Sequence, residues 1–310
     1  MTASPRAPER LLRRLEWTVL RRLDGLLQGD YRSLFRGFGL DLADLREYQH
    51  GDDVRHIDWN ATARSDAAYV RQFQEDREVS AWLLLDLSGS VDFGSDGRTK
   101  RDQSAEFAGL VARLLTRHGN RVGAIVYGDR VEAVIPARGG RRHVLQLLDA
   151  ALAPRERGRA QAGPTRLHEL VEAAGRIVRR RSLVFVVSDF VGEPGWPRSL
   201  ARLAARHETI AVRLVDPLER ELPDLGLIAM SDAETGERLL VDTHDAGFRG
   251  RFAAAAEARE AALRDAFGEA GVDALELSTD EDVSDALMRF AAMRRLQARR
   301  GAAGAQAVAA

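Results

Sequence analysis

The stretch from residue 79 to residue 90, VSAWLLLDLSGS, constrains the fold of this chain more than any other. Its first seven residues are mostly apolar, which is typical of a strand buried on both faces of a parallel sheet. The stretch then continues through Asp86, Ser88 and Ser90. Alternate residues just past the end of such a strand lie in the crevice where open α/β sheets bind ligands. One carboxylate and two hydroxyls are therefore expected to converge on one point.

These oxygen donors suit a hard cation. Without histidine or cysteine, they favour Mg²⁺, with Mn²⁺ or Ca²⁺ as alternatives, over Zn²⁺ or copper. Three such residues alone would leave the cation under-coordinated, so other loops at the same edge must supply more oxygens. Two candidates fit: Asp189, which ends a second apolar strand, and Thr165, in a turn directly before a helix. The alternative interpretation is a loop whose Asp and Ser side chains cap the following helix.

The composition of the chain excludes several classes of function. The chain has 310 residues, no cysteine and a formal net charge of -1. Disulfides and thiol chemistry are excluded, and no overall attraction to nucleic acid or anionic lipid is expected. The apolar runs are too short for a signal sequence or a transmembrane segment, so a cytoplasmic location is expected. The only lysine, Lys100, lacks the upstream glycine of a phosphate-binding GxxxxGK[ST] loop, so this chain is not expected to bind a nucleotide.

Segments of strand and helix character alternate after the central strand. Further buried strands are expected at residues 182–188 and 209–215, helices at 102–118, 141–152 and 167–180, and a hairpin at 225–242. This alternation predicts the α/β class, with a mostly parallel sheet, helices on both faces and an antiparallel strand pair at one edge. We expect one domain over residues 79–300, with a β-hairpin insertion at about 217–245, and a disordered tail over 301–310.

Residues 1–78 are expected to form a separate N-terminal helical and β segment. Residues 10–27 have the spacing of an amphipathic helix, which packs on its own domain or on a partner, with a membrane surface as the less favoured alternative. Residues 45–64 then mix charges of both signs with large apolar side chains. This density predicts a hydrogen-bonded clamp against the next domain, with a partner-binding or metal-facing role as the alternative. The clamp residues are Arg46, Glu47, Tyr48, Asp52, Asp53, Arg55, Asp58, Trp59 and Arg64.

The set Asp86, Ser88, Ser90, Thr165 and Asp189 resembles the metal-ion-dependent adhesion site of von Willebrand factor A domains. The resemblance implies a von Willebrand factor A-like, Rossmann-like fold. It also implies Mg²⁺ bound by the hydroxyls and by the carboxylates, which act directly or through water. Because few charged groups would contact the ion, it would keep an open position that an Asp or Glu of a partner protein fills. Metal binding would then serve protein recognition.

The upstream segment extends the resemblance. Arg46-Glu47-Tyr48, Gly51-Asp52-Asp53, Ile57-Asp58-Trp59 and Ser188-Asp189-Phe190 look like the bacterial family catalogued as domain of unknown function 58, over roughly residues 37–295. Relatives are commonly encoded beside MoxR-type AAA+ ATPases, which implies an adaptor or co-chaperone role with such an ATPase and a client protein. Many relatives carry N-terminal membrane helices, and this chain departs from that pattern.

The enzymatic alternative is a Mg-dependent phosphatase-like hydrolase of the haloacid dehalogenase type, with Asp86 as nucleophile. That chemistry needs a second carboxylate two residues later and a lysine near the phosphoryl group. Ser88 occupies the position of the second carboxylate, and Lys100 lies between the central strand and its helix, where we expect it to be poorly placed. The sequence therefore favours a non-enzymatic, metal-dependent interaction protein.

Overall fold

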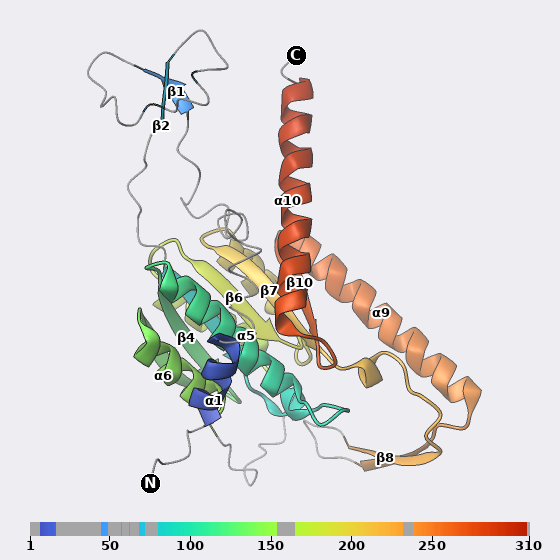
Figure 1. The fold of residues 1–310 in the computed structure, drawn as a ribbon. Coiled ribbons are helices and arrows are strands. Elements are labelled where there is room, and N and C mark those ends of the chain that lie inside the picture. Colours follow the sequence, from blue (N-terminus) through green and yellow to red (C-terminus); the bar gives the residue numbers. More distant parts are fainter. Residues whose placement is uncertain are drawn as a thin grey trace, which may run out of the picture.

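A six-stranded sheet forms the centre of the protein in the computed structural model, which describes residues 7–16, 45–48, 57, 62, 68–71, 80–153, 165–231 and 238–308 (Figure 1). The strands are β3 (Ser80–Asp86), β4 (Arg121–Tyr127), β5 (Val131–Arg138), β6 (Leu183–Ser188), β7 (Glu208–Val215) and β10 (Asp273–Ser278). Their order is β10-β7-β6-β3-β4-β5. Every neighbouring pair is parallel except β4 and β5, so the expected antiparallel pair lies at one edge.

Helices cover both faces of this sheet, which confirms the predicted α/β class. They are α1 (Ala7–Arg14), α5 (Lys100–Arg117), α6 (Arg141–Ala151), α7 (Leu167–Ile177), α8 (Trp196–Ala204), α9 (Ala246–Ala270) and α10 (Val283–Val308). Apolar side chains of α1, α5, α6 and α10 form one core with the sheet, and those of α7, α8 and α9 form the other.

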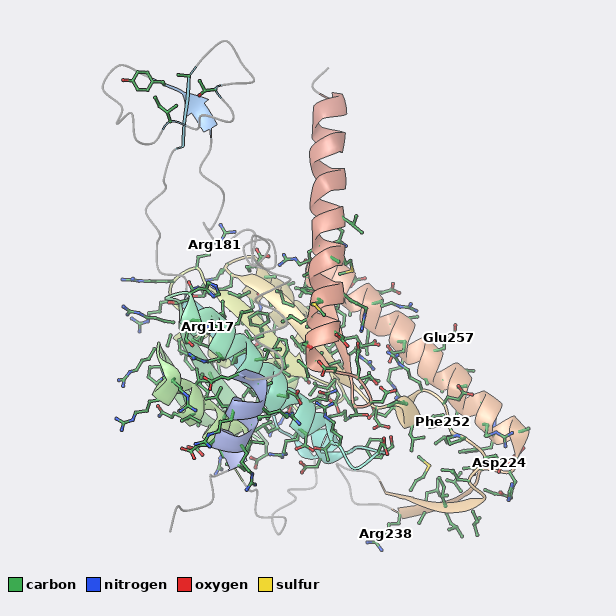
Figure 2. The ribbon with its side chains drawn as sticks, in the orientation of Figure 1. Arg117, Arg181, Asp224, Arg238, Phe252 and Glu257 are labelled. Atoms are coloured by element: carbon green, nitrogen blue, oxygen red, sulfur yellow. The ribbon has the colours of Figure 1, made fainter. Side chains whose placement is uncertain are left out.

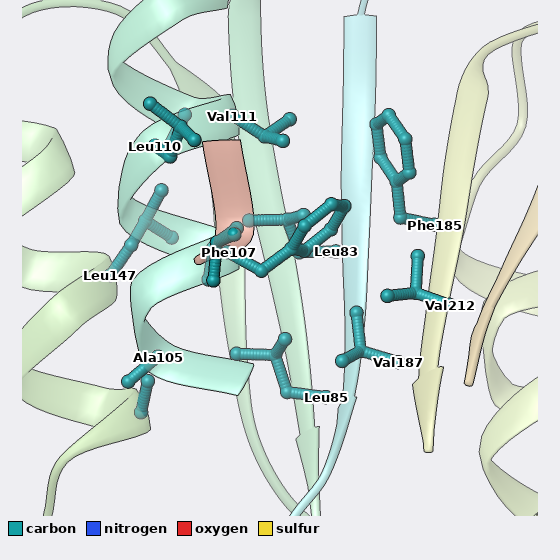
Figure 3. Close-up of a cluster of buried hydrophobic side chains, with 14 of the residues drawn as sticks. Leu83, Leu85, Ala105, Phe107, Leu110, Val111, Leu147, Phe185, Val187 and Val212 are labelled. Carbon is teal, nitrogen blue, oxygen red and sulfur yellow. The ribbon is translucent and has the colours of Figure 1, made fainter. Parts of the chain in front are cut away.

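The apolar run of β3 supplies both cores because successive side chains of a strand point to opposite faces. Leu83 and Leu85 lie in the first core with Phe107 of α5 and Phe185 of β6 (Figure 3). Leu84 lies in the second core. All three leucines of β3 are fully buried, as the run of consecutive apolar residues predicted.

The N-terminal helix joins the first core. Leu12 and Leu15 are fully buried among side chains of α5 and α6, so this helix packs on its own domain, which was the favoured of the expected alternatives. The helix begins at Ala7, and residues 17–44, which include the rest of the predicted 10–27 helix, lie outside the described residues.

Little of the predicted clamp lies within the described residues. Strand β1 (Leu45–Glu47) contains Arg46 and Glu47 and pairs in antiparallel fashion with β2 (Tyr69–Arg71). Tyr48 continues the pairing, because its backbone N–H donates to the carbonyl of Ala68 at 2.7 Å. These two strands stand apart from the main sheet (Figure 1). The remaining clamp residues, Asp52, Asp53, Arg55, Asp58, Trp59 and Arg64, lie outside the described residues, so the clamp stays a prediction.

The expected hairpin insertion is present between β7 and α9. It consists of β8 (Leu227–Ser231) and β9 (Arg238–Asp242), paired in antiparallel fashion. Figure 1 shows it beyond the end of the sheet, next to the first turns of α9. Figure 2 labels Arg238, the first residue of β9, and Asp224, which precedes β8. The side chains of four leucines here are more than half exposed: Leu225, Leu227, Leu239 and Leu240.

The end of the chain differs from the prediction. We expected residues 301–310 to be a disordered tail, whereas α10 continues as far as Val308. Alanine has the highest helix propensity, and this segment is rich in alanine, which favours continuation of the helix. Among the described residues, no helix combines the length and the apolarity needed to cross a bilayer.

Parallel strands end along a single edge of the sheet, which we call the carboxyl edge and define by the last residues of β3, β4, β6, β7 and β10. Asp216 follows β7 here and is fully buried. Its carboxylate accepts hydrogen bonds from Ser95 N at 2.9 Å, Ser95 Oγ at 3.0 Å, Leu218 N at 2.9 Å and Thr279 Oγ1 at 2.6 Å. Burial alone would raise the pKa of Asp216, but these hydrogen bonds hold it below its ordinary value of 3.8. Asp216 therefore ties three connections together at this edge.

We expect Asp216→Ala to lower the free energy of unfolding by about 2–4 kcal/mol at pH 7, because it leaves several buried donors without an acceptor. Urea denaturation followed by circular dichroism measures this loss. Because the folded-state pKa is depressed, the stabilisation is present above about pH 4 and disappears as the pH falls through the folded-state pKa. Asp149→Ala, at an exposed position of α6, is the control and should change stability by less than about 0.5 kcal/mol. Equal stability of the two variants would contradict the role of Asp216.

Candidate functional site

The register of β3 and β6 places Asp86 beside Ser188. Leu85 pairs with Val187, so the next residue of each strand lies at the carboxyl edge. Ser188 Oγ donates to Asp86 Oδ2 at 2.6 Å, and Ser88 N donates to Asp86 Oδ1 at 3.0 Å. Asp86 is fully buried. The carboxylate is therefore fixed in orientation from both sides.

Ser88 and Ser90 lie directly after Asp86, where the chain enters the short 3₁₀ helix η3 (Gly89–Asp92). Their hydroxyl oxygens are 3.2 Å apart, and both residues are buried. The helix-capping alternative does not account for them. Ser88 makes no side-chain capping bond to η3, and the next helix, α5, is capped by Thr99 and Asp102 instead.

Asp189 reaches the same edge from a strained turn after β6. Phe190 has a φ of 56°, a left-handed conformation that is unfavourable for a bulky residue. Its ring packs against Trp196 and Phe267 at centroid distances of 5.0 and 4.8 Å, and its N–H donates to Ser188 Oγ at 2.9 Å. Asp189 is 1% exposed, and its Oδ1 accepts from Val191 N at 3.1 Å.

Thr165 lies against the loop that follows Asp189. Its carbonyl accepts a hydrogen bond from Glu193 N at 2.8 Å, and the residue is buried. Gly192 has a φ of 139°, and a Cβ on it would lie 2.2 Å from the Thr165 carbonyl oxygen. Only glycine permits this close approach. The five residues singled out from the sequence therefore occupy adjoining loops at the carboxyl edge.

Two buried carboxylates, those of Asp86 and Asp189, lie in this region. Burial is the larger cause and repulsion from Asp189 the second cause of a raised pKa of Asp86, which lies at about 6 instead of 3.8. The hydrogen bonds from Ser188 and Ser88 oppose this shift. A cation between the loops would relieve this repulsion. Within the described ranges, no group of three or more His, Asp and Glu side chains suits a metal ion, so a cation here would depend on the serine and threonine oxygens as well.

Lys100 is the neighbour that sequence reasoning misplaced. It is the first residue of α5 and is 1% exposed. Its Nζ donates to Asp189 Oδ2 at 2.7 Å and to Glu219 Oε1, in the 3₁₀ helix η4 (Pro217–Glu219), at 2.6 Å. Burial alone would lower the pKa of Lys100, but these carboxylates raise it above 10.5. The expectation that Lys100 is poorly placed for this site is therefore wrong.

The sequence carried a weak signal for two of the residues that the prediction of the site missed, Lys100 and Ser188. Lys100 is the only lysine among 46 basic residues, and it opens the helix that follows the Asp86 loop. Ser188 directly precedes Asp189, so strand register alone could have placed it opposite Asp86. Glu219 had no such signal, because its position depends on the path of the connection after β7.

Comparison with known proteins identifies relatives along most of the chain. The family model described as "Protein of unknown function DUF58" matches residues 44–262. The uncharacterized protein Rv1480 of Mycobacterium tuberculosis strain H37Rv is 38% identical over 284 residues, which cover 92% of this chain and 89% of that protein. The uncharacterized protein Mb1516 of Mycobacterium bovis matches with the same values.

Two solved structures align with this chain along most of their own length. The conserved hypothetical protein BatB of Bacteroides thetaiotaomicron is 13% identical with a TM-score of 0.45, covering 70% of this chain and 98% of that chain. The SpRpn10 VWA domain is 13% identical with a TM-score of 0.38, covering 68% of this chain and 93% of that chain. The match of the family model and the identity to the mycobacterial proteins show that the chain belongs to the DUF58 family.

Proposed function

We propose that this protein is a metal-dependent protein-interaction module whose site lies at the carboxyl edge of the sheet. The observation that carries the proposal is that two buried carboxylates, Asp86 and Asp189, lie at the ends of neighbouring strands, next to the paired hydroxyls of Ser88 and Ser90. Buried carboxylates that repel each other favour a cation, and hydroxyl and carboxylate oxygens suit Mg²⁺, with Mn²⁺ and Ca²⁺ as alternatives.

Asp86, Ser88, Ser90, Thr165 and Asp189 would hold the ion. When bound, Mg²⁺ would supply a positive centre that attracts a carboxylate of a partner protein. Asp86 has one oxygen committed to Ser188 and the other to Ser88 N, so its position is fixed before any ion arrives. Three of the five residues offer neutral hydroxyls, which leave more of the ion's charge for the partner.

The surface beside the site suits a protein partner. Phe93, shortly after Ser90, and Val191, two residues after Asp189, are 41% and 37% exposed. Apolar side chains next to a cation site match a partner surface in which an acidic residue is flanked by apolar ones. The resemblance to a family encoded beside MoxR-type AAA+ ATPases supports an adaptor role with such an ATPase, which would hydrolyse the nucleotide, and with a client protein.

A Mg-dependent, phosphatase-like hydrolase is the second candidate. The position of Lys100 favours it, since an ammonium group beside Asp189 could neutralise a phosphoryl group. Ser88 disfavours it, because the residue two positions after Asp86 offers no carboxylic acid. Mg-dependent turnover of a phosphoester that Asp86→Asn abolishes would favour this enzyme over the interaction module.

We expect Ser88→Ala/Ser90→Ala to abolish Mg²⁺-dependent binding of an AAA+ ATPase, because the variant removes two of the proposed ligands. The measurement is affinity capture of the purified protein's partners from its host lysate, with Mg²⁺ or with EDTA, followed by mass spectrometry. Ser182→Ala/Ser199→Ala removes two buried serines outside the site and should behave as the wild type. Capture that is unchanged by EDTA and by the first variant would overturn the proposal.

We expect Asp86→Asn to stabilise the metal-free protein at pH 7 by about 1–3 kcal/mol, because it removes a charge that burial disfavours first and repulsion from Asp189 disfavours second. The folded-state pKa of Asp86 is raised, so wild-type stability falls as the pH rises from about 4 to 7, and this component is absent from the variant. Denaturation in EDTA across this pH range measures the difference.

Excess Mg²⁺ should then stabilise the wild type and leave Asp86→Asn unchanged, since ligand binding to the folded state raises stability. Asp149→Asn, at an exposed position of α6, controls for the loss of a carboxylate. An Asp86→Asn variant that is less stable than the wild type in EDTA at pH 7 would contradict the unfavourable environment inferred for the Asp86 charge.

A further inference from the structure

Lys100 occupies a position that the proposed function leaves unexplained. Its side chain is 1% exposed and connects Asp189, which is 1% exposed, with Glu219, which is 26% exposed. A lysine is rarely this buried unless it is paired. Both of its carboxylate partners lie at the carboxyl edge, and one of them is a proposed metal ligand.

The identity of this residue is as informative as its place. The chain has 46 basic residues, and every one except Lys100 is an arginine. Many ion pairs elsewhere in the described residues use arginine, such as Arg294 with Asp273 and Arg213 with Glu260. An ammonium is a compact point charge, whereas a guanidinium is a broad planar fork. Lys100 therefore places a compact positive charge between Asp189 and Glu219.

Lys100 also limits what Asp189 can offer to a metal. One oxygen of Asp189 accepts from Val191 N and the other accepts from Lys100 Nζ at 2.7 Å. A divalent ion must therefore displace Lys100, contact Asp189 through water, or share an oxygen that already has a donor. In each case the positive charge of Lys100 opposes the charge of the ion.

We propose that Lys100 is a built-in counter-charge that lowers the affinity of the site for divalent cations. The inference rests on the proposed metal site and deepens it. Lys100 neutralises Asp189 when no ion is bound, and Glu219 offsets part of the lysine charge. The site then binds a metal weakly by itself and firmly when a carboxylate of the partner adds negative charge. Lys100 is thus a positioning residue, which sets affinity without contacting the ion.

Mn²⁺ titration of the purified full-length chain, by calorimetry and by loss of the free-ion paramagnetic resonance signal, tests this inference. Lys100→Met should tighten Mn²⁺ binding by about tenfold or more, because one opposing charge is removed. Glu219→Gln should weaken binding severalfold, because it leaves the lysine charge less balanced. Lys100→Arg keeps the charge and should not tighten binding. Arg142→Met, at an exposed position of α6, removes a charge elsewhere and should leave the affinity unchanged.

The opposite signs separate a charge effect from damage to the fold, because a merely structural role would weaken binding in both variants. Should Lys100→Met fail to fold, Glu219→Gln decides, and unchanged or tighter binding in it overturns the inference. Suppose that the wild type binds Mn²⁺, that Ser88→Ala/Ser90→Ala loses this binding, and that a folded Lys100→Met binds no more tightly than the wild type. This result overturns the inference about Lys100 and leaves the metal site standing. Absence of Mn²⁺ binding in the wild type and in Lys100→Met overturns both the inference and the metal site. Binding in Lys100→Met alone supports the inference.

Discussion

Parallel pairing of β3 with β6 is the constraint on which the site depends. It brings the ends of two separate apolar runs to one edge, so that Asp86 and Ser188 meet within hydrogen-bonding distance. Asp189 follows Ser188 directly, just before the strained turn at Phe190. A shift of one residue in this register would turn each side chain of β6 to the opposite face of the sheet. The cores on both faces therefore fix the geometry of the polar edge.

Much of the fold and part of the site could be predicted from the sequence because both depend on local pattern. The apolar runs that end in Asp86 and Asp189 predicted buried parallel strands, and the alternation with helical segments predicted the class. The hairpin predicted over residues 225–242 is present as the antiparallel pair β8 and β9. These features share a short-range cause, since strand burial and turn chemistry act within a few residues.

The remaining features of the site depend on paths that no local pattern encodes. Lys100 contacts Asp189 because α5 starts at the carboxyl edge, 89 positions earlier in the sequence. Glu219 joins them from a connection a further 30 residues along, and Asp216 ties Ser95 to Thr279 across similar separations. The charge balance of the site is a property of these long-range contacts. The chemical type of the proposed ligands could therefore be predicted from the sequence, whereas their electrostatic environment could not.

The connection from β7 to β9 carries both Glu219, which balances the charge of Lys100, and the exposed leucines of the hairpin. Glu219 lies at the start of the connection that continues into β8 and β9, whose leucines are more than half exposed. The same connection begins at Asp216, which anchors it with buried hydrogen bonds. A partner that contacted the hairpin would therefore engage a segment whose base is rigid and carries the counter-ion of Lys100. One anchored connection therefore joins the exposed leucines of the hairpin to the residue that balances the charge of Lys100.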